Sequence, residues 1–325
     1  MKTLSPALIP LLLIVSTLSL LAGCATVTNQ PQLTLQQHKL VGKIWDVKQQ
    51  AFINRAAVIK KLQKTNYLLL GERHDNPVHH QHQAWFIRQL KNNQQEASVA
   101  FEMIDNVQAK QLAQQSISSA GQMIRTLNNT KTNWQYERRY QALFGEVIAA
   151  GYQINAANIS RQQLMHMVMH NENKLPPAYQ RMLNQAAFSK TQENKLQYEI
   201  NQSHCNLLDD NSSKSMLLGQ RLRDATMAHS LLKSQSAVSV LIAGLGHARN
   251  DLAVPVYIDS DKIMSVGFIE VEQHINEPAA YAKVWNTESL PFDIVWFTPQ
   301  VKRKDMCEQI KQHFKNKATT SKQNL

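Results

Sequence analysis

The stretch Tyr67-Leu68-Leu69-Leu70-Gly71-Glu72-Arg73-His74 sets the architecture expected for the whole chain. Its first four residues form a short apolar run, which is typical of a strand that is buried on both faces of a sheet. Gly71 can leave the strand in a backbone conformation that other residues resist, and Glu72 and His74 follow at once. Pro77 then opens a helical pattern. A strand, a polar turn and a helix in this order predict a sheet whose ligands lie beyond the carboxyl ends of its strands.

Strand and helix patterns alternate on both sides of this stretch. The apolar residues recur at helical spacing in some segments and form short β-type runs in others. The predicted helices are 36–50, 55–64, 77–93 and 134–150, and the predicted strands are 67–70, 97–101, 152–157, 237–243, 254–258, 264–271 and 292–297. This alternation predicts an α/β fold with a mostly parallel sheet flanked by helices.

Residues 161–233 differ from the rest of the chain. They contain no strand pattern and few glycines, and their helical runs are broken at Pro176-Pro177 and at 209–213. We therefore predict that a smaller, all-helical subdomain is inserted into an α/β domain that spans 39–300. The remaining residues, 301–325, are predicted to form a basic C-terminal helix and tail.

The amino terminus is predicted to be a targeting signal. A lysine precedes an apolar run over 7–20, and Leu21-Ala22-Gly23-Cys24 resembles the lipobox of bacterial lipoproteins. The alternative is an uncleaved membrane anchor, but the run is shorter than the about 20 apolar residues that a spanning helix needs. We therefore expect residues 1–23 to be a lipoprotein signal peptide and Cys24 to carry the lipid.

The predicted location is the bacterial outer membrane, on its periplasmic side. Ala25 follows the lipidated cysteine, where an aspartate would signal retention in the inner membrane. Residues 24–38 then form a tether between the lipid and the fold. The formal net charge of +11 would usually suggest a nucleic-acid partner, but an exported protein does not meet one. An anionic ligand or an acidic lipid surface remains. Cys205 and Cys307 could pair in an oxidising compartment, and the sequence does not decide this.

Polar residues follow four of the predicted strands at their carboxyl ends. They are Glu72 with His74, Glu102, Asn158 and His247. Because the carboxyl ends of parallel strands meet at one edge of the sheet, we expect these five residues to converge, and we call them the strand-edge site. Two carboxylates and two imidazoles suit either a divalent metal or acid–base chemistry. The alternative is that each residue is structural, as a carboxylate at a helix N-terminus or as a turn cap.

Two further groups of polar residues are given structural interpretations. His79, His80 and His82 lack a full metal-ligand pattern, and they predict a solvated, histidine-rich helix face. The 220–228 segment contains two arginines and an aspartate, which can form ordinary ion pairs on a helix surface. Arg221 and Arg223 point to different faces of that helix, so at most one of them is expected to reach the strand-edge site.

With these residues located, a family resemblance can be stated. Gly71-Glu72-Arg73-His74 and Gly244-Leu245-Gly246-His247 look like the paired G-x-x-H motifs of the Tiki superfamily, Glu102 matches its glutamate, and Arg139 or Arg138 matches its arginine. Within that superfamily the chain resembles the ChaN-like haem-binding lipoproteins of iron uptake. The further stretches that carry this narrower resemblance are 134–140, 158–161, 204–205, 220–224, 227–228 and 295–299. The chain departs from the pattern at 251–255, where relatives tend to have glycine before the Val-Pro pair.

The resemblance implies a large α/β domain, a smaller helical domain, and ferric haem bound between two protomers with the haems face to face. In that family a tyrosine ligates the iron, and a histidine of the partner contacts the propionates. An anionic phenolate favours ferric iron, and the axial ligand is one of the protein's main influences on haem. By this resemblance Tyr198 and Tyr140 are the first candidates for the iron ligand, His204 for the propionate contact, and Arg223 for a contact with a ligand carboxylate.

Two functions from different classes are therefore expected. The first is a dimeric, outer-membrane-anchored haem-binding protein for haem and iron acquisition, with an outer-membrane haem receptor as a candidate partner. The second is a metal-dependent hydrolase, an esterase or a peptidase, in which His74, Glu102 and His247 hold a divalent metal that activates water. We favour the first because the family-like helical insert extends the resemblance. The sequence does not decide which tyrosine ligates the iron, how many haems bind, or whether the chain has an activity.

Overall fold

A computed structural model describes residues 31–130, 134–169, 175–305 and 307–309. The predicted signal peptide, the lipidation site Cys24 and the predicted tail from residue 310 onward lie outside the described residues. Within the described ranges, no helix combines the length and the apolar character that crossing a membrane requires.

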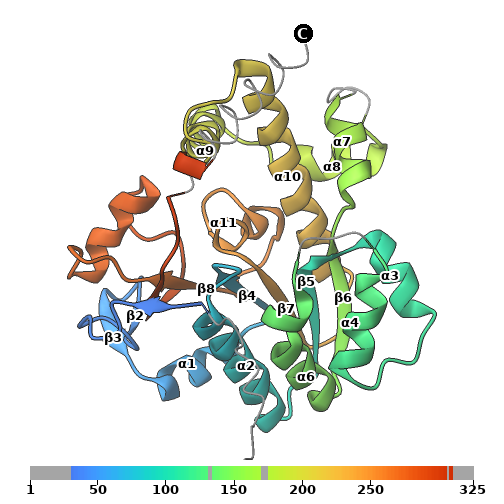
Figure 1. The fold of residues 1–325 in the computed structure, drawn as a ribbon, viewed down its shortest axis with the longest axis horizontal. Helices are drawn as coiled ribbons and strands as arrows, with labels where there is room; N and C mark the ends of the chain where they lie inside the picture. Colours follow the sequence, from blue (N-terminus) through green and yellow to red (C-terminus); the bar gives the residue numbers. More distant parts are fainter. Residues whose placement is uncertain (1–30, 131–133, 170–174, 306, 310–325) are drawn as a thin grey trace, which may run out of the picture. The chain divides into compact units, whose positions relative to one another are not determined.

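An eight-stranded sheet forms the centre of the unit that spans 31–325 (Figure 1). The strand order is β3-β2-β9-β8-β4-β7-β5-β6. The six strands from β9 to β6 are parallel, whereas β2 pairs antiparallel with both β9 and β3. The bounds are β2 Ile44–Asp46, β3 Ala51–Ile53, β4 Tyr67–Glu72, β5 Ala97–Asp105, β6 Gln153–Asn158, β7 Val238–Gly244, β8 Ile263–Glu270 and β9 Ile294–Thr298. The predicted α/β fold with a mostly parallel sheet is confirmed.

Strand β4 lies inside this sheet, and its side chains face two separate cores. Leu68 and Leu70 belong to the core on one face, and Leu69 belongs to the core on the other, as the alternation of a strand requires. A Cβ atom added at Gly71 would lie 2.8 Å from the Cβ of Ala248. The glycine therefore lets α11 (Leu245–Ala248), the short helix after β7, pack directly against the strand.

Helices that precede and follow β4 in the sequence cover the sheet. They are α1 Arg55–Leu62, α2 Pro77–Asn92, α3 Asn106–Ala113, α4 Ala120–Asn128, α5 Tyr136–Arg139 and α6 Gln141–Ala150. Asn76 caps α2 by accepting from the Val78 N–H at 2.9 Å, and Pro77 takes the first helical position, where its missing N–H costs nothing. Gly151 ends α6 with φ +75°, at the position that the sequence indicates.

The segment predicted to be a helical insert contains only helices in its described part. They are α7 Arg161–Met169, α8 Pro177–Gln185, α9 Lys190–Ser203 and α10 Asp210–Leu232. They enclose a core of their own, formed by Ile159, Leu164, Leu175, Leu183, Leu218, Leu222 and Ala225. Figure 1 shows α10 running from this group toward the sheet, where it packs against β6 and β7.

Three predictions of local structure are wrong. Residues 36–50 form turns and strand β2 rather than a helix, because Gly42 takes φ +79° and breaks the helical path. Residues 254–258 form a 3₁₀ helix (η2, Val254–Tyr257) rather than a strand, since Pro255 has no N–H for a sheet ladder. The helix predicted over 134–150 is split into α5 and α6 at Tyr140.

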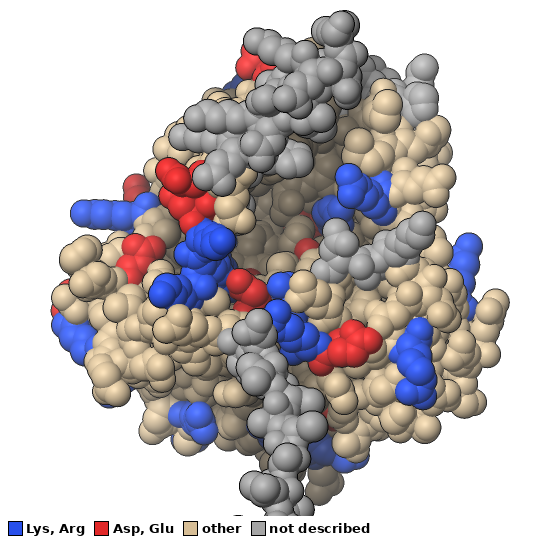
Figure 2. All heavy atoms as spheres, viewed as in Figure 1, with Lys and Arg blue, Asp and Glu red and all other residues tan. Residues whose placement is uncertain are grey.

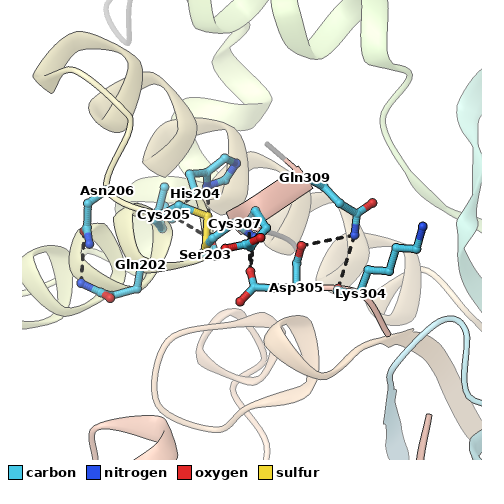
Figure 3. The surroundings of a disulfide bond; sticks show 11 residues. Gln202, Ser203, His204, Cys205, Asn206, Lys304, Asp305, Cys307 and Gln309 are labelled. Atoms are coloured by element: carbon cyan, nitrogen blue, oxygen red, sulfur yellow. Dashed lines mark hydrogen bonds between the residues drawn. A yellow bond between two sulfur atoms is a disulfide. The ribbon is translucent and has the colours of Figure 1, made fainter. Parts of the chain in front are cut away.

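The C-terminal segment is fixed to two parts of the structure. Strand β10 (Gln300–Val301) pairs with β1 (Leu33–Thr34), and the Arg303 guanidinium then binds both Asp75 and Glu270, each at 2.6–2.8 Å. Beyond it, Cys307 forms a disulfide with Cys205, just after the end of α9 (Figure 3). The pairing that the sequence leaves open is thus present in the structure. A second 3₁₀ helix, η3 (Pro278–Trp285), precedes β9.

Candidate functional site

The carboxyl ends of four parallel strands bring the residues of the strand-edge site together. Glu72 is the last residue of β4, Asn158 is the last residue of β6, and His247 lies in α11 directly after β7. Glu102 lies inside β5, because that strand runs to Asp105 and not only to residue 101 as predicted. Figure 2 shows a hollow near the centre of the face in view, with both basic and acidic side chains around it.

His74 lies between two carboxylates. Its Nδ1 is 2.8 Å from Glu72 Oε1, and its Nε2 is 3.6 Å from Glu102 Oε2. The hydroxyl of Tyr140 donates to the same Glu72 oxygen at 2.6 Å, and Trp134 packs its ring edge-on against the imidazole. Burial alone would lower the pKa of His74, but the charges of Glu102 and Glu72 outweigh burial and raise it. The arrangement therefore favours the imidazolium form.

His247 bridges Glu102 and an aspartate of α10. Its Nε2 is 3.5 Å from Glu102 Oε1, and its Nδ1 is 2.6 Å from Asp224 Oδ1. Burial opposes the charged imidazole, but the two carboxylates outweigh it and raise the pKa of His247 to about 10. Burial also raises the pKa of Asp224 to about 6, although His247 acts in the opposite direction. His247 is thus held as a cation.

Glu102 is the carboxylate that both histidines share. Burial would raise its pKa, but His247 and His74 outweigh burial and lower the pKa to about 2. The backbone N–H of Gly244 also donates to Glu102 Oε2 at 2.7 Å. A Cβ at Gly244 would lie 3.1 Å from His74 Nε2, so glycine lets this backbone approach both groups closely. The second glycine motif therefore builds the site through its backbone as well as through His247.

The amide of Asn158 connects the site to α10. Its Nδ2 donates to the Glu102 carbonyl at 2.9 Å, and its Oδ1 accepts from Arg223 Nη1 at 2.7 Å. Arg221 points instead into the helical subdomain, where it donates to the carbonyls of Leu183 and Ala186. Only one of the two arginines reaches the strand-edge site, as the helix geometry predicts. Arg139, partly exposed on α5, lies near enough to Tyr140 to lower that tyrosine's pKa, although burial and Glu72 raise it well above the ordinary value.

Two functional residues are missed by the sequence interpretation. His80 is buried with its Nε2 3.2 Å from Glu72 Oε2, so the prediction of a solvated histidine face is wrong. Asp224 is fully buried, so its interpretation as a surface ion-pair residue is also wrong. Helical spacing contains the signal for both. His80 shares a face with the predicted apolar residues Ala84 and Ile87, and Asp224 is one turn before buried Ala228.

The residues assigned to haem by the resemblance fall in two places. Tyr140 is fully buried and Arg223 is half-buried, and both contact residues of the strand-edge site. Tyr198 lies on α9 with 53% of its surface exposed, and within the described ranges its hydroxyl has no hydrogen-bond partner. His204 caps the end of α9, and its Nδ1 is 2.8 Å from the Ile200 carbonyl. The structure therefore separates the exposed Tyr198 and the half-buried His204 from the buried charged cluster.

The metal-dependent alternative is not supported. His74, Glu102 and His247 do come together, but the two imidazoles form ion pairs with carboxylates and have raised pKa values. Metal ligation needs neutral imidazoles, so these pairs oppose it. Over the residues that the structure describes, no group of three or more His, Cys, Asp or Glu side chains is arranged to hold a metal ion.

Comparison with known proteins gives one family and one informative fold match. Residues 58–258 match the family described as haem-binding uptake, Tiki superfamily, ChaN. A ChaN structure from Campylobacter jejuni, described as showing cofacial haem binding, is 21% identical, with a TM-score of 0.62, over 78% of this chain and 95% of that one. This likeness shows the fold.

More distant structures add nothing further. An erythromycin esterase mutant (EreC) in its open conformation is 11% identical, with a TM-score of 0.44 over 78% of this chain and 95% of its own. The type III effector HopBA1 is 13% identical, with a TM-score of 0.40 over 74% and 91%. A separate comparison with curated proteins finds none that matches the chain. With the family match covering more than half of its length, and with both glycine–histidine motifs at the strand edge, this chain belongs to the ChaN family of haem-binding uptake proteins in the Tiki superfamily.

Proposed function

We propose that this chain is a lipoprotein that binds ferric haem as a dimer for haem and iron acquisition. Membership of a haem-binding family supports the binding of haem. The lipobox that ends at Cys24 supports attachment to the outer membrane on the periplasmic side. The dimer rests on the resemblance and on the structure of the Campylobacter jejuni ChaN, whose description reports cofacial haem binding. An outer-membrane haem receptor is the partner that such a carrier would serve.

One observation carries the proposal: Tyr198 on α9 is exposed, and within the described residues its hydroxyl has no hydrogen-bond partner. Tyr198 is 53% exposed on α9, Leu207 is 47% exposed just after it, and Met216 is 39% exposed at the start of α10. Exposed large apolar side chains of this kind can contact an apolar ligand. A porphyrin is flat and largely apolar, so it can contact such side chains.

The two candidate tyrosines differ in whether they can reach iron. Tyr140 is fully buried, donates to Glu72 at 2.6 Å, and has a pKa raised well above the ordinary value by burial and by Glu72. A phenolate at that position would face a carboxylate. Tyr198 is neither buried nor hydrogen-bonded to a carboxylate. We therefore assign Tyr198 as the iron ligand. Its anionic phenolate would favour the ferric state of the bound haem.

His204 is suited to a propionate contact across a dimer. Its Nδ1–H donates to the Ile200 carbonyl, which leaves Nε2 facing away from its own helix. In the proposed dimer, His204 of the partner subunit would donate to the propionates of the haem held by Tyr198. This arrangement needs two copies, because Tyr198 and His204 are six residues apart and do not share one helix face.

A haemin titration of the detergent-solubilised full chain, followed by absorbance and size-exclusion chromatography, tests this function. We expect saturable binding with a ferric tyrosinate spectrum and a shift to dimer. Tyr198→Phe should remove that spectrum and weaken binding by roughly tenfold or more, which is at least about 1.4 kcal/mol. Tyr179→Phe, on α8 of the same subdomain, is the matched control. Binding without saturation would refute the haem proposal, and an unchanged spectrum in Tyr198→Phe would refute the ligand assignment alone.

A further inference from the structure

Helix α9 carries the proposed iron ligand, yet few of its side chains are buried. The structure describes all 14 residues of this helix, and among them only Leu196 is buried. Tyr198 itself is exposed. A helix with one buried apolar side chain gains little from the hydrophobic effect. The position of α9, and with it the position of Tyr198, therefore depends on polar contacts.

Polar side chains along one face of α9 bind the segment that follows α11 (Figure 1). Glu199 accepts a hydrogen bond from Arg249 Nη1, and Lys195 Nζ lies 2.8 Å from Asp251 Oδ2. One turn earlier, Gln192 Nε2 donates to the Asp251 carbonyl at 3.2 Å. At 3.6 residues per turn, the three residues of α9 lie within about 60° of one another around the helix. Contacts along two turns of one face fix the rotation of the helix about its axis.

Arg249 lies at the centre of this network. Its Nε donates to Asp251 Oδ1 at 2.6 Å and its Nη2 donates to Asp251 Oδ2 at 2.8 Å, while Nη1 binds Glu199. The residue is 2% exposed, and its guanidinium carbon lies 5.3 Å from the centroid of the Trp285 ring. Because the guanidinium is a rigid planar fork, the bidentate contact with Asp251 sets the direction in which Nη1 meets Glu199. Asp251 belongs to the stretch 251–255, at which the chain departs from the family resemblance.

The backbone on either side of Arg249 is attached to the α/β domain. The Ala248 carbonyl accepts from Ser265 Oγ on β8, and the Asn250 N–H donates to the Pro291 carbonyl at 2.8 Å. Ala248 also packs against β4 at the glycine of that strand. Arg249 therefore connects a fixed part of the α/β domain to α9.

The charges of the network compensate one another. Arg249 and Lys195 are cations, and Glu199 and Asp251 are anions. Removing one member of a buried ion pair leaves the charge of its partner uncompensated. Without Arg249, the two carboxylates would share one lysine, and their repulsion would favour movement of α9 away from Asp251. The network thus opposes displacement of α9 only while Arg249 is present.

Tyr198 lies beside the face of α9 that this network holds. It directly precedes Glu199 and follows Lys195 by three residues. A rotation of α9 would therefore change the direction of the Tyr198 hydroxyl. We propose that Arg249 is a positioning residue for haem ligation, which holds α9 through Glu199 and Asp251 and thereby aims Tyr198 at the iron. This inference rests on the proposed function, in which Tyr198 ligates ferric haem.

Haemin binding by Arg249→Gln tests the proposal with the detergent-solubilised full chain. The substitution removes the charge and the donors that bind the two carboxylates. We expect haemin release to be faster by roughly tenfold, which is about 1.4 kcal/mol, and a smaller fraction of the bound haem to show the tyrosinate spectrum. Arg249→Lys keeps the charge but not the planar fork, so it should give intermediate values. In the haem-free variant Arg249→Gln, amide hydrogen exchange should be faster in α9 and unchanged in α10.

Two further variants separate positioning from a general loss of stability. Lys61 lies 2.9 Å from the buried carboxylate of Asp46, and this pair joins α1 to β2. Lys61→Gln also leaves a buried carboxylate without its cation, so it should lower the free energy of unfolding but leave haemin release and the spectrum unchanged. Glu199→Gln breaks the same contact as Arg249→Gln at a half-buried position, and it replaces that variant if Arg249→Gln does not fold. The effects of the two glutamine substitutions on haemin release should be less than additive, because both remove one contact.

Unchanged haemin release and an unchanged spectrum in folded Arg249→Gln would overturn the proposal, even if hydrogen exchange in α9 is faster. Equal effects of Lys61→Gln and Arg249→Gln on haemin release would also overturn it, since lost stability would then explain both. Failure of the proposed function has a different signature. In that case the unsubstituted chain binds haemin without saturation, or Tyr198→Phe keeps the tyrosinate spectrum, and the positioning role fails with it.

Discussion

At the scale of single residues, Glu102 organises the strand-edge site. It is 7% exposed, and each of its two carboxylate oxygens faces a different imidazole. Removing one partner from a buried charged group costs more than the pair contributes in net stability, since the remaining charge is left uncompensated. The histidines and the glutamate therefore depend on one another for burial. This coupling makes the folded state sensitive to pH.

We predict that the free energy of unfolding is highest between about pH 4.5 and 6.5 as far as His247 and Glu102 determine it. The pKa of His247 is raised from its ordinary 6.5 to about 10, so its contribution is full below pH 6.5 and is lost as the pH rises toward 10. The pKa of Glu102 is lowered from 4.5 to about 2, so its contribution is present above pH 4.5 and is lost as the pH falls toward 2. Urea unfolding midpoints from pH 3 to 10 measure both limbs.

The variant His247→Gln separates this effect from other titrations. It should be less stable at pH 6 and should show a flatter alkaline limb than the unsubstituted chain. The exposed pair of Arg88 with Glu146, at 2.6 Å, provides the control, since Glu146→Gln removes a surface pair of small value and should leave both limbs in place. A midpoint for the unsubstituted chain that stays constant from pH 6.5 to 9 would contradict the assignment.

At the scale of elements, the sequence predicts most of the sheet because local and tertiary signals agree there. The predicted bounds of strand β4 and helix α2 agree with the structure to within two residues at each end, because the uninterrupted apolar run and the capped helix start are strong local signals. The failures lie where one residue overrides a pattern. Gly42 takes a positive φ, which interrupts the predicted helix, and Pro255 has no N–H to donate to a neighbouring strand.

The candidate site follows the same division. The convergence of strand ends can be predicted, since it needs only the inference of a parallel sheet. The contribution of α10 cannot, because no local pattern says which helix of an insert returns to the sheet. Asp224 and Arg223 therefore look like surface residues until the fold places α10 beside β6. The spacing of His80 within α2 predicts that its side chain is buried. The interpretation of the three histidines as a solvated helix face overlooked this signal.

Contact between β4 and α11 gives a prediction at this scale. Gly71→Ala adds a Cβ 2.8 Å from Ala248 and 3.2 Å from the Leu245 backbone, so the α11 turn must shift. Overpacking of this kind costs about 1–3 kcal/mol. Gly145→Ala is the matched control, because nothing lies within 4 Å of its added Cβ and it sits inside α6. It should stabilise the chain by up to about 1 kcal/mol. Equal effects of the two substitutions in denaturant unfolding would refute the close-packing argument.

At the scale of the whole unit, the C-terminal segment connects the sheet to the helical subdomain. Arg303 holds the segment to Asp75, the residue after His74, and the disulfide holds it to the residue after His204 (Figure 3). The last six residues before Cys205 and the two after it contain no fully buried side chain. The end of α9 is therefore held by this covalent link and by the ion pair of Glu199 with Arg249, which gives the C-terminal segment a share in positioning Tyr198.

We predict that Cys205→Ser/Cys307→Ser lowers the free energy of unfolding and weakens haemin binding. The bridge closes a loop with a sequence separation of 102, for which the chain-entropy model gives about 4–5 kcal/mol. Loosening the end of α9 should also broaden the positions of Tyr198 and speed haemin release, because an ordering cost then falls on binding. Denaturant unfolding and haemin off-rates, each with and without reductant, measure the two effects. Reductant should lower the free energy of unfolding and raise the haemin off-rate of the unsubstituted chain to the values of the double serine variant, and it should leave that variant unchanged. A loss of stability with an unaltered off-rate would mean that the bridge supports the fold without positioning the end of α9.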